Sequence, residues 1–291
     1  MTNSIPQPEM SADRTMANAG VLRGQEYYVA ETDETGLGAV DAVPDAGTPT
    51  SQWAEAWNYL RRRPLFWFSA VLILLAVTVA VFPGLFTSVD PRECMLSRSL
   101  NGPTDGHIFG FDRQGCDIYS RMMYGARASV TVGVLTTLIV TVLGGLIGAI
   151  AGYFGGIWDT LLSRLTDIFF AVPLVLAAIV VMSMFQNKRS IWMVVFALSM
   201  FGWTQIARIT RGAVMGIKND EFVTAARAVG ASDWKIITSH ILPNAAAPVI
   251  VYATVALGQF IVAEATLSFL GIGLPSKVVS WGGDCLLYTS D

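Results

Sequence analysis

The sequence predicts an all-α membrane protein, and three observations point to this fold class. The chain of 291 residues is 53% hydrophobic but only 14% charged, whereas soluble domains average about 25% charged residues. Its mean hydropathy is +0.52. Five stretches, each between 17 and 29 residues long, contain no charged side chain. This composition excludes an ordinary soluble enzyme and a wholly disordered chain.

Each uncharged stretch is long enough to cross a bilayer as a helix, which takes about 20 apolar residues. We predict spans at 64–86, 128–156, 168–185, 191–207 and 245–263. One such stretch by itself would also fit a buried core helix, but five in one chain favour the membrane. Pro173 lies inside the third span, where it is expected either to kink the helix or to act as a gating hinge.

Residues 1–58 are predicted to be a disordered acidic tail on the cytoplasmic side. The first 50 residues carry eight acidic and two basic side chains, a net charge of −6, so the remainder of the chain carries +3. They show no sustained apolar period and cannot bury enough surface to offset the entropy of ordering. No basic segment leads into an apolar one there, which excludes a signal peptide.

Basic residues beside the spans set the expected orientation in the cell membrane. Arg61, Arg62 and Arg63 precede the first span and place the N-terminus in the cytoplasm. The segments 88–127 and 186–190 are then external, while 157–167 and 208–244 are internal loops. The loop 208–244 holds five Lys or Arg residues, as the rule requires, but the external segment 88–127 also holds five arginines.

The second predicted span carries three glycines that are spaced four residues apart. Gly144, Gly148 and Gly152 therefore share one helix face. Small residues on such a face allow transmembrane helices to approach closely. Glycine is also common in membrane helices in general, but we interpret this face as a packing surface, within the bundle or against a partner subunit.

The internal segment 219–243 is predicted to form two short amphipathic helices. Asp220 and Glu221 begin the first helix, where acidic residues suit the positive helix terminus. Gly230 is placed to end it as a glycine of the C′ type. Spacing of the form i, i+3, i+4, i+7 gives this helix one apolar face, formed by Phe222, Ala225, Ala226 and Val229.

The second of these helices can be capped by Ser232 or Asp233. Its apolar residues repeat on one face at Trp234, Ile237 and Ile241. Pro243 is expected to stop it and lead into the fifth span. A cytoplasmic helix–turn–helix with small residues on one face fits close contact with another protein.

This segment resembles the EAA motif of ABC importer permeases. Ala225-Ala226, Gly230 and His240-Ile-Leu-Pro243 match the motif, with Thr224 in place of its glutamate and His240 where isoleucine is common. The form AARAVGAS…HILPN is similar to that of the dipeptide and oligopeptide importer subfamily. The resemblance implies a coupling loop that docks into a groove on an ATPase subunit. The implied coupling residues are Asp220, Glu221, Ala225, Ala226, Gly230, His240, Leu242 and Pro243.

Two further stretches resemble the same subfamily. Residues 107–127, HIFGFDRQGCDIYSRMMYGAR, look like the segment before its second helix, with departures at Phe111 and Cys116. Residues 264–273, EATLSFLGIG, look like the segment after its fifth helix. The resemblance makes 59–284 the expected permease domain. It implies the MetI-like transmembrane domain of a type I ABC importer, with five of six expected spans visible.

The resemblance also implies function and partners. It implies a C-type permease for dipeptides or oligopeptides, joined by a B-type permease, two ABC ATPase subunits and an extracytoplasmic solute-binding protein. Glutathione and nickel chelates stay open as substrates. The chain contains no G-x-x-x-x-G-K-[ST] loop, so ATP and Mg²⁺ are expected on the ATPase subunits and no cofactor on this chain. Membrane lipid is an expected partner and nucleic acid is not.

Two other classes of function fit the sequence poorly. An intramembrane enzyme needs paired catalytic side chains, and the five predicted spans contain no Asp, Lys, Arg or His. A stand-alone ion-coupled transporter needs intramembrane acids and an internal repeat, and neither is evident. Co-purification with ATPase subunits would separate this second class from a permease.

The C-terminal residues 285–291, CLLYTSD, continue none of these patterns. They back-translate to TGT CTC TTA TAC ACA TCT GAC, which matches a transposon end used as a sequencing adapter. We therefore expect the native sequence to end near Asp284 and the remainder to be non-native, with a natural divergent tail as the alternative. Resequencing across the Asp284 codon would decide between them.

The cysteine pair of the predicted external segment and the acidic residue after the fifth span are each open to two interpretations. Cys94 and Cys116 lie in the external segment, where an oxidising compartment permits a disulfide. Sequence spacing cannot show whether their Cβ atoms meet, so a bonded pair and two separate thiols both stay open. Glu264 directly follows the fifth span and either lines the substrate path or has a structural role within the bundle.

The internal segment 157–167 contains a small group of charges. Asp159, Arg164 and Asp167 form either a local ion network or a contact with the ATPase. The two histidines of the chain are too few for a metal cluster. His107 is therefore expected to make a loop contact, and His240 to support the coupling loop rather than to carry protons.

Overall fold

The computed structural model describes residues 52–289. The chain divides into two units, residues 1–63 and 64–291. Of the predicted tail, residues 1–51 lie outside the described part of the chain. Its last part, 52–58, is helical rather than disordered, because it forms most of α2 (Gln52–Leu60). Trp53, Trp57 and Leu60 recur there at helical spacing, which gives this segment the apolar stripe that residues 1–50 lack.

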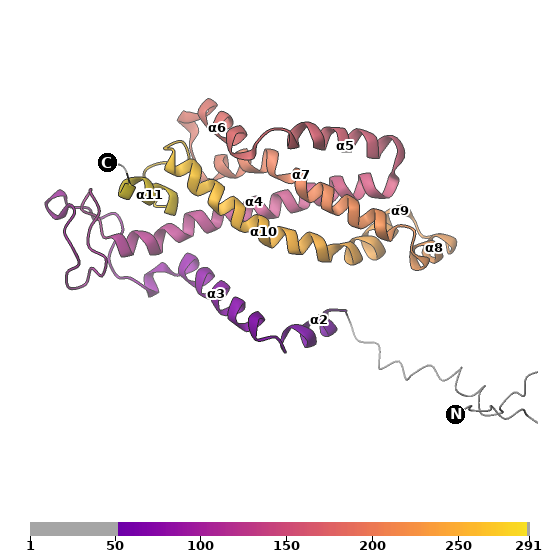
Figure 1. Ribbon diagram of the computed structural model, residues 1–291, viewed down its shortest axis with the longest axis horizontal. Coiled ribbons are helices and arrows are strands. Elements are labelled where there is room, and N and C mark those ends of the chain that lie inside the picture. The colour runs from indigo at the N-terminus through magenta and orange to yellow at the C-terminus, as the bar shows by residue number, and fades with distance from the viewer. Residues whose placement is uncertain (1–51, 290–291) are drawn as a thin grey trace, which may run out of the picture. The chain divides into compact units, whose positions relative to one another are not determined.

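The second unit is built from long apolar helices. Among the described residues, the helices able to cross a membrane are α3 (Pro64–Val81), α4 (Ile118–Phe154), α7 (Ile191–Ile217) and α10 (Leu242–Phe269). A fifth crossing results if the bent pair α5 (Gly156–Phe170) and α6 (Leu174–Met184) counts as one span. Helices α4, α7 and α10 pack side by side, with α5 beside α4 and α7 (Figure 1). The predicted all-α membrane fold is confirmed.

Short helices occupy the segments between the long ones. They are η1 (Pro83–Leu85), η2 (Leu96–Arg98), η3 (Gln186–Lys188), α8 (Glu221–Ala228), α9 (Asp233–Ile236), the π-helix η4 (Ile237–Ile241) and α11 (Trp281–Thr289). Helices α8 and α9 lie at one end of the bundle, and α11 lies at the other end, against α10 and α4 (Figure 1). Residues 285–289, which are predicted to be non-native, continue α11 as helix.

The prediction is wrong for the third span and for the internal loop before it. Residues 157–167 form most of α5 rather than a loop, and α5 meets α6 at an angle of 77°. Because α5 contains charged residues, a search for uncharged runs misses it, although its apolar residues recur at helical spacing. Pro173 precedes the first residue of α6 and has no N–H with which to continue the α5 hydrogen bonds. The expected kink is therefore a complete break between two helices.

The first predicted span, 64–86, is too long, because α3 ends at Val81 and Pro83 has no N–H to continue it. Helices α4 and α7 instead extend past their predicted spans, because the charged residues in the extensions have partners. Helix α4 begins at Ile118, ahead of the predicted start at 128. Its Arg127 donates to the carbonyl oxygen of Val81 in α3 at 3.0 Å. Helix α7 continues through Arg208 and Arg211, which both pair with acids of α5. Pairing lowers the cost of a charge at the edge of the membrane, so the helix does not have to end there.

The glycine face of α4 packs against α7, which confirms its interpretation as a packing surface. A Cβ atom on Gly144 would lie 2.5 Å from the carbonyl oxygen of Trp203, and one on Gly152 would lie 2.9 Å from that of Arg211. A Cβ atom on Gly148 would collide with the carbonyl oxygen of Ala207. The two backbones therefore approach as closely as they do only because these side chains are absent.

The segment before α4, which was predicted to be external, is fastened at several points. Cys94 and Cys116 form a disulfide across 22 positions, with their Cα atoms 4.1 Å apart. Asp117 caps α4 by accepting a hydrogen bond from the backbone of Ser120 at 2.7 Å, and it also lies 2.9 Å from Nδ1 of His107. His107 is thus a loop contact in the structure. The cap explains why α4 starts where it does.

Glu264 lies within α10, which continues beyond the predicted fifth span to Phe269. Its side chain is fully buried, and Oε1 accepts a hydrogen bond from the hydroxyl of Ser268 at 2.7 Å. The same hydroxyl accepts a hydrogen bond from the backbone N–H of Leu274 at 3.2 Å. Glu264 thereby connects the end of α10 to the loop that follows it, as the structural interpretation expects. Its buried Oε2 atom has no hydrogen-bond partner among the described residues, so the role in the substrate path stays a prediction.

Candidate functional site

The predicted coupling segment folds as two helices joined by a glycine turn. Helix α8 ends in a Schellman motif, in which the N–H of Ala231 donates to the oxygen of Ala226 at 3.1 Å and the N–H of Gly230 donates to that of Arg227 at 3.0 Å. Gly230 has a φ of +85°, which favours glycine. The predicted termination at Gly230 is confirmed, and α9 begins three residues later.

The second helix does not stop at Pro243, which corrects the prediction. Helix α9, the π-helix η4 and α10 follow one another without a break, and Pro243 lies in the first turn of α10. A proline at that position needs no backbone N–H of its own. The wider π-turn just before it accommodates the ring within a continuous helical path. The coupling segment is therefore joined directly to a membrane-spanning helix.

The buried face of the segment differs from the predicted one. Val223 of α8 is fully buried, whereas Phe222 is 42% exposed and Val229 is 90% exposed. On the second helix Ile237 and Ile241 are buried as predicted, but Trp234 is 67% exposed. Helical spacing identifies residues that share a face, but the helices α4 and α7 decide which face turns inward. The buried residues are Val223, Ile236, Ile237, Ile241 and Ala245, which pack on Ala149, Tyr153 and Val214.

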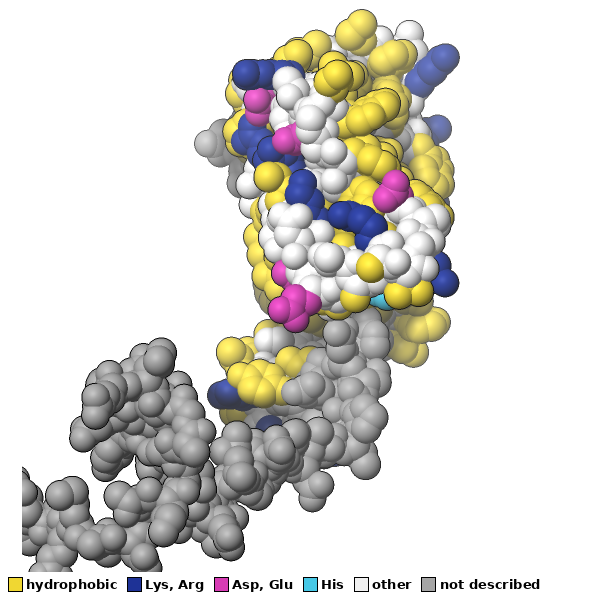
Figure 2. All heavy atoms as spheres, turned by 90° about the vertical axis from the view of Figure 1, so that its right-hand side faces the viewer, with side chains coloured by type: hydrophobic (Ala, Val, Ile, Leu, Met, Phe, Trp, Pro, Cys, Tyr) yellow, Lys and Arg dark blue, Asp and Glu magenta, His cyan; other side chains and the backbone are white. Residues whose placement is uncertain are grey.

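The predicted coupling residues occupy different environments. Asp220 precedes the first residue of α8 without a side-chain cap, and Glu221 lies in the first turn. Of the predicted set, the exposed members are Asp220, Glu221, Ala225, Gly230 and Pro243, and the partly buried members are Ala226, His240 and Leu242. The apolar side chains that project outward are instead Phe222, Val229 and Trp234. We call them the coupling surface, after the role predicted for this segment. Figure 2 shows this end of the molecule, where basic and hydrophobic side chains are exposed together.

Polar contacts fix the coupling segment to the end of α4. The hydroxyl of Tyr153 donates to Oδ1 of Asp233 at 2.5 Å, and the guanidinium of Arg227 lies 6.0 Å from the centre of the Tyr153 ring. The ammonium of Lys218 donates to the carbonyl oxygen of Gly152 at 3.0 Å. Sequence reasoning did not identify Tyr153, because nothing in the second span signals a partner 80 positions away.

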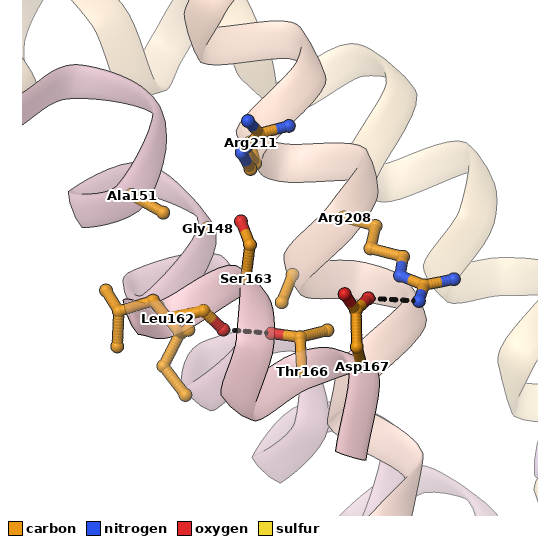
Figure 3. Close-up of a pocket in the computed structure, with 10 residues that line it drawn as sticks. Gly148, Ala151, Leu162, Ser163, Thr166, Asp167, Arg208 and Arg211 are labelled. Carbon is orange, nitrogen blue, oxygen red and sulfur yellow. Dashed lines mark hydrogen bonds and ion pairs between the residues drawn. The ribbon is translucent and has the colours of Figure 1, made fainter. Parts of the chain in front are cut away.

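Ion pairs between α5 and α7 support the same end of the bundle. Arg211 pairs with Asp159, and Arg208 pairs with Asp167 at 2.7 Å. The charges of 157–167 therefore make a local network, but its cations come from α7, and Arg164 takes no part in it. The two arginines border a cavity of about 390 Å³ between α4, α5 and α7, where Figure 3 shows Arg208 directed at Asp167.

Two protein-family models match parts of the chain. The family described as "Binding-protein-dependent transport system inner membrane component" matches residues 144–289. The family described as "N-terminal TM domain of oligopeptide transport permease C" matches residues 51–103. The first match covers half of the chain and includes the whole coupling segment.

Named relatives extend the similarity over most of the chain. The dipeptide transport system permease protein DppC of Alkalihalophilus pseudofirmus is 36% identical over 238 residues, which are 82% of this chain and 78% of that protein. The oligopeptide transport system permease protein OppC of Bacillus subtilis is 33% identical over 244 residues, 84% and 79% of the two chains. The glutathione transport system permease protein GsiD of Escherichia coli is 36% identical over 231 residues, 79% and 76%. The chain therefore belongs to the family of binding-protein-dependent transport system inner membrane components, as a multi-pass membrane protein of the type I importer fold.

Proposed function

We propose that the chain is the permease subunit of an ATP-driven importer for dipeptides and oligopeptides. The observation that carries this proposal is the coupling surface, where Phe222, Val229 and Trp234 expose apolar area beside basic side chains on a segment anchored to α4. Exposed apolar residues grouped in this way mark a protein interface. The names of the relatives support peptides as the solute, and the name of the glutathione permease supports glutathione as the second candidate.

The partners follow from the same proposal. Two ATPase subunits bind ATP and Mg²⁺ and contact the coupling surface, and a B-type permease completes the membrane pore. An extracytoplasmic solute-binding protein delivers the peptide. The N-terminus lies in the cytoplasm, on the same side as the ATPases. The chain itself neither binds nor hydrolyses nucleotide, which its lack of a phosphate-binding loop supports.

The geometry supports a direct route for motion from the ATPases to the membrane. When ATP draws the two ATPases together, each docked coupling segment moves with its ATPase. Because α9, η4 and α10 form one continuous path, this movement tilts α10, while the contact of Tyr153 with Asp233 transmits it to α4. The cavity between the two permeases then changes its open side. Such a shift requires only that ATP binds the two states with different affinity.

Capture of the ATPase subunits by the full-length permease, together with its partner permease, tests the proposal. The informative substitution is Val229→Asp, because Val229 is 90% exposed and an aspartate there displaces no buried side chain. Gly230→Arg is less suitable, since an arginine at φ +85° also strains the turn. We expect Val229→Asp to reduce capture about ten-fold or more, as at a central interface residue.

Leu96→Asp is the matched control, because Leu96 is 78% exposed but belongs to the external segment. This variant should capture the ATPases as the wild type does. Equal capture by Val229→Asp and wild type would show that the coupling surface is not the main contact. A wild type that captures no ATPase in the presence of its partner permease would refute the importer function. Uptake of trialanine compared with glutathione then separates the two candidate solutes.

A further inference from the structure

A second cavity, of about 390 Å³, lies beside the break between α5 and α6. Its lining comes from the end of α5, from Pro173 at the break, and from α7 and α10. None of its lining residues carries a charge. It thereby differs from the cavity of Figure 3, which Arg208 and Arg211 border. A cavity of this size is within the range of small-molecule sites.

Three polar side chains line this cavity without a hydrogen-bond partner among residues 52–289. They are Gln205 of α7 and Tyr252 and Gln259 of α10. The Oε1 atom of Gln205 is buried and has no partner. Tyr252 is partly buried and Gln259 is exposed. All three residues belong to uncharged stretches predicted to cross the membrane, where a polar group without a partner is costly. Polar groups retained at such a position are candidates for contact with a solute.

The helices hold these groups toward one space. Tyr252 and Gln259 are seven positions apart and so share a face of α10, while Phe201 and Gln205 are four apart on α7. The aromatic ring of Phe169, at the end of α5, lies 5.7 Å from that of Phe201. The cavity thus combines neutral hydrogen-bonding groups with an aromatic wall, next to a broken helix. Broken helices beside polar groups within the membrane recur at solute sites of transporters.

We propose that this cavity is a transient site for the backbone amides of the peptide in transit, which rests on the proposed function. The side-chain amides of Gln205 and Gln259 both donate and accept, as the peptide N–H and C=O groups require, and the Tyr252 hydroxyl supplies a third partner. Neutral hydrogen bonds hold a peptide weakly enough for it to leave again. They also recognise the backbone, which all peptides share, rather than a particular side chain.

ATP-driven uptake into proteoliposomes tests this proposal, with the permease assembled with its partner permease, ATPases and binding protein. Trialanine is the probe. We expect Gln205→Leu and Gln259→Leu each to lower the initial uptake rate by up to about ten-fold, the scale of one neutral hydrogen bond. Gln205→Asn, which keeps an amide, should recover part of the rate. Gln186→Leu is the matched control, because Gln186 is exposed in η3 and lines no part of the cavity.

Trialanine with methylated backbone nitrogens shows whether Gln205→Leu acts through lost hydrogen bonds to the peptide or through a general disturbance of the helices. Methylation removes N–H donors, so it should slow uptake by the wild type more than uptake by Gln205→Leu. The binding protein is the same in both assays, and its own preference therefore cancels. Subunit assembly and ATPase capture should be the same for Gln205→Leu as for the wild type.

Three results would overturn the inference. Uptake of trialanine by Gln205→Leu and Gln259→Leu at the wild-type rate would show that the cavity does not hold the peptide. An equal effect of methylation on both permeases would show the same. Loss of subunit assembly in these variants would show that a neighbouring helix, not a solute, covers the polar groups. A wild-type complex that imports no peptide would instead refute the proposed function, and this inference with it.

Discussion

Arg211 of α7 and Asp159 of α5 are joined by two hydrogen bonds, from Nε to Oδ1 at 2.5 Å and from Nη2 to Oδ2 at 2.7 Å. This parallel geometry is the strongest that an arginine and a carboxylate can form. The pair joins α5, the helix that follows α4, to α7, the helix on which the glycine face of α4 packs. It is formed across 52 positions of sequence, next to the coupling segment.

Removing this pair should weaken the bundle at its coupling end. We expect Asp159→Asn to lower the free energy of unfolding by about 1–2 kcal/mol, because the pair is half-buried and doubly bonded. Asp167→Asn is the control, since Asp167 makes one hydrogen bond to Arg208 and is 50% exposed. Its effect should stay below about 1 kcal/mol. Thermal unfolding in detergent measures both, and equal shifts would contradict the difference in geometry.

The glycine face of α4 offers a comparison between neighbouring positions. Gly148→Ala should destabilise the protein by about 1–3 kcal/mol, because the new Cβ collides with the backbone of α7 at Ala207. Gly145→Ala should be neutral or stabilising by up to about 1 kcal/mol, because no atom lies within 4 Å of the new Cβ and alanine restricts the unfolded chain. Unfolding temperatures of the two variants check this, and a destabilised Gly145→Ala would contradict the assigned face.

The disulfide between Cys94 and Cys116 should stabilise the segment before α4. Replacing Cys94 and Cys116 together by serine opens a loop of 22 positions, which costs about 3 kcal/mol in the chain-entropy description. The variant should unfold at a lower temperature than the wild type. A reducing agent should shift the unfolding temperature of the wild type alone, and mass spectrometry of the oxidised wild type should find the two thiols bonded. Free thiols in that sample would refute the pairing.

Asp284 should make stability depend on pH. Burial raises the pKa of the Asp284 carboxyl above its usual value of 3.8, although Arg121 donates to it at 2.6 Å and opposes the shift. The folded state therefore holds its proton more tightly than the unfolded state, so stability falls as pH rises from about 4 through the raised pKa. Asp284→Asn should reduce this fall, whereas Asp105→Asn, at an exposed position, should not. A wild type that gains stability over this range would show the opposite sign.

Composition and local pattern were sufficient to predict most of the architecture. Apolar residues must cover the lipid-facing surface along the whole of a span, so the helices α3, α4, α7 and α10 were visible as uncharged stretches. The turn at Gly230 was also visible, because only glycine suits its backbone conformation. Helix α5 was missed, because its Asp159, Arg164 and Asp167 interrupt the apolar run that identifies a span.

The sequence by itself determined that the chain is a membrane protein of helices and that 219–243 is the segment resembling a coupling loop, since both depend on short-range composition and spacing. Tertiary structure alone decided which side chains of that segment face outward, because α8 turns Val223 rather than Phe222 toward α4 and α7. It also decided that the α4 glycines meet α7, that Arg121 reaches Asp284 across 163 positions, and that Gln205 and Gln259 share one cavity. Periodicity defines the faces of a helix, but the partner of each face depends on contacts between residues far apart in the chain.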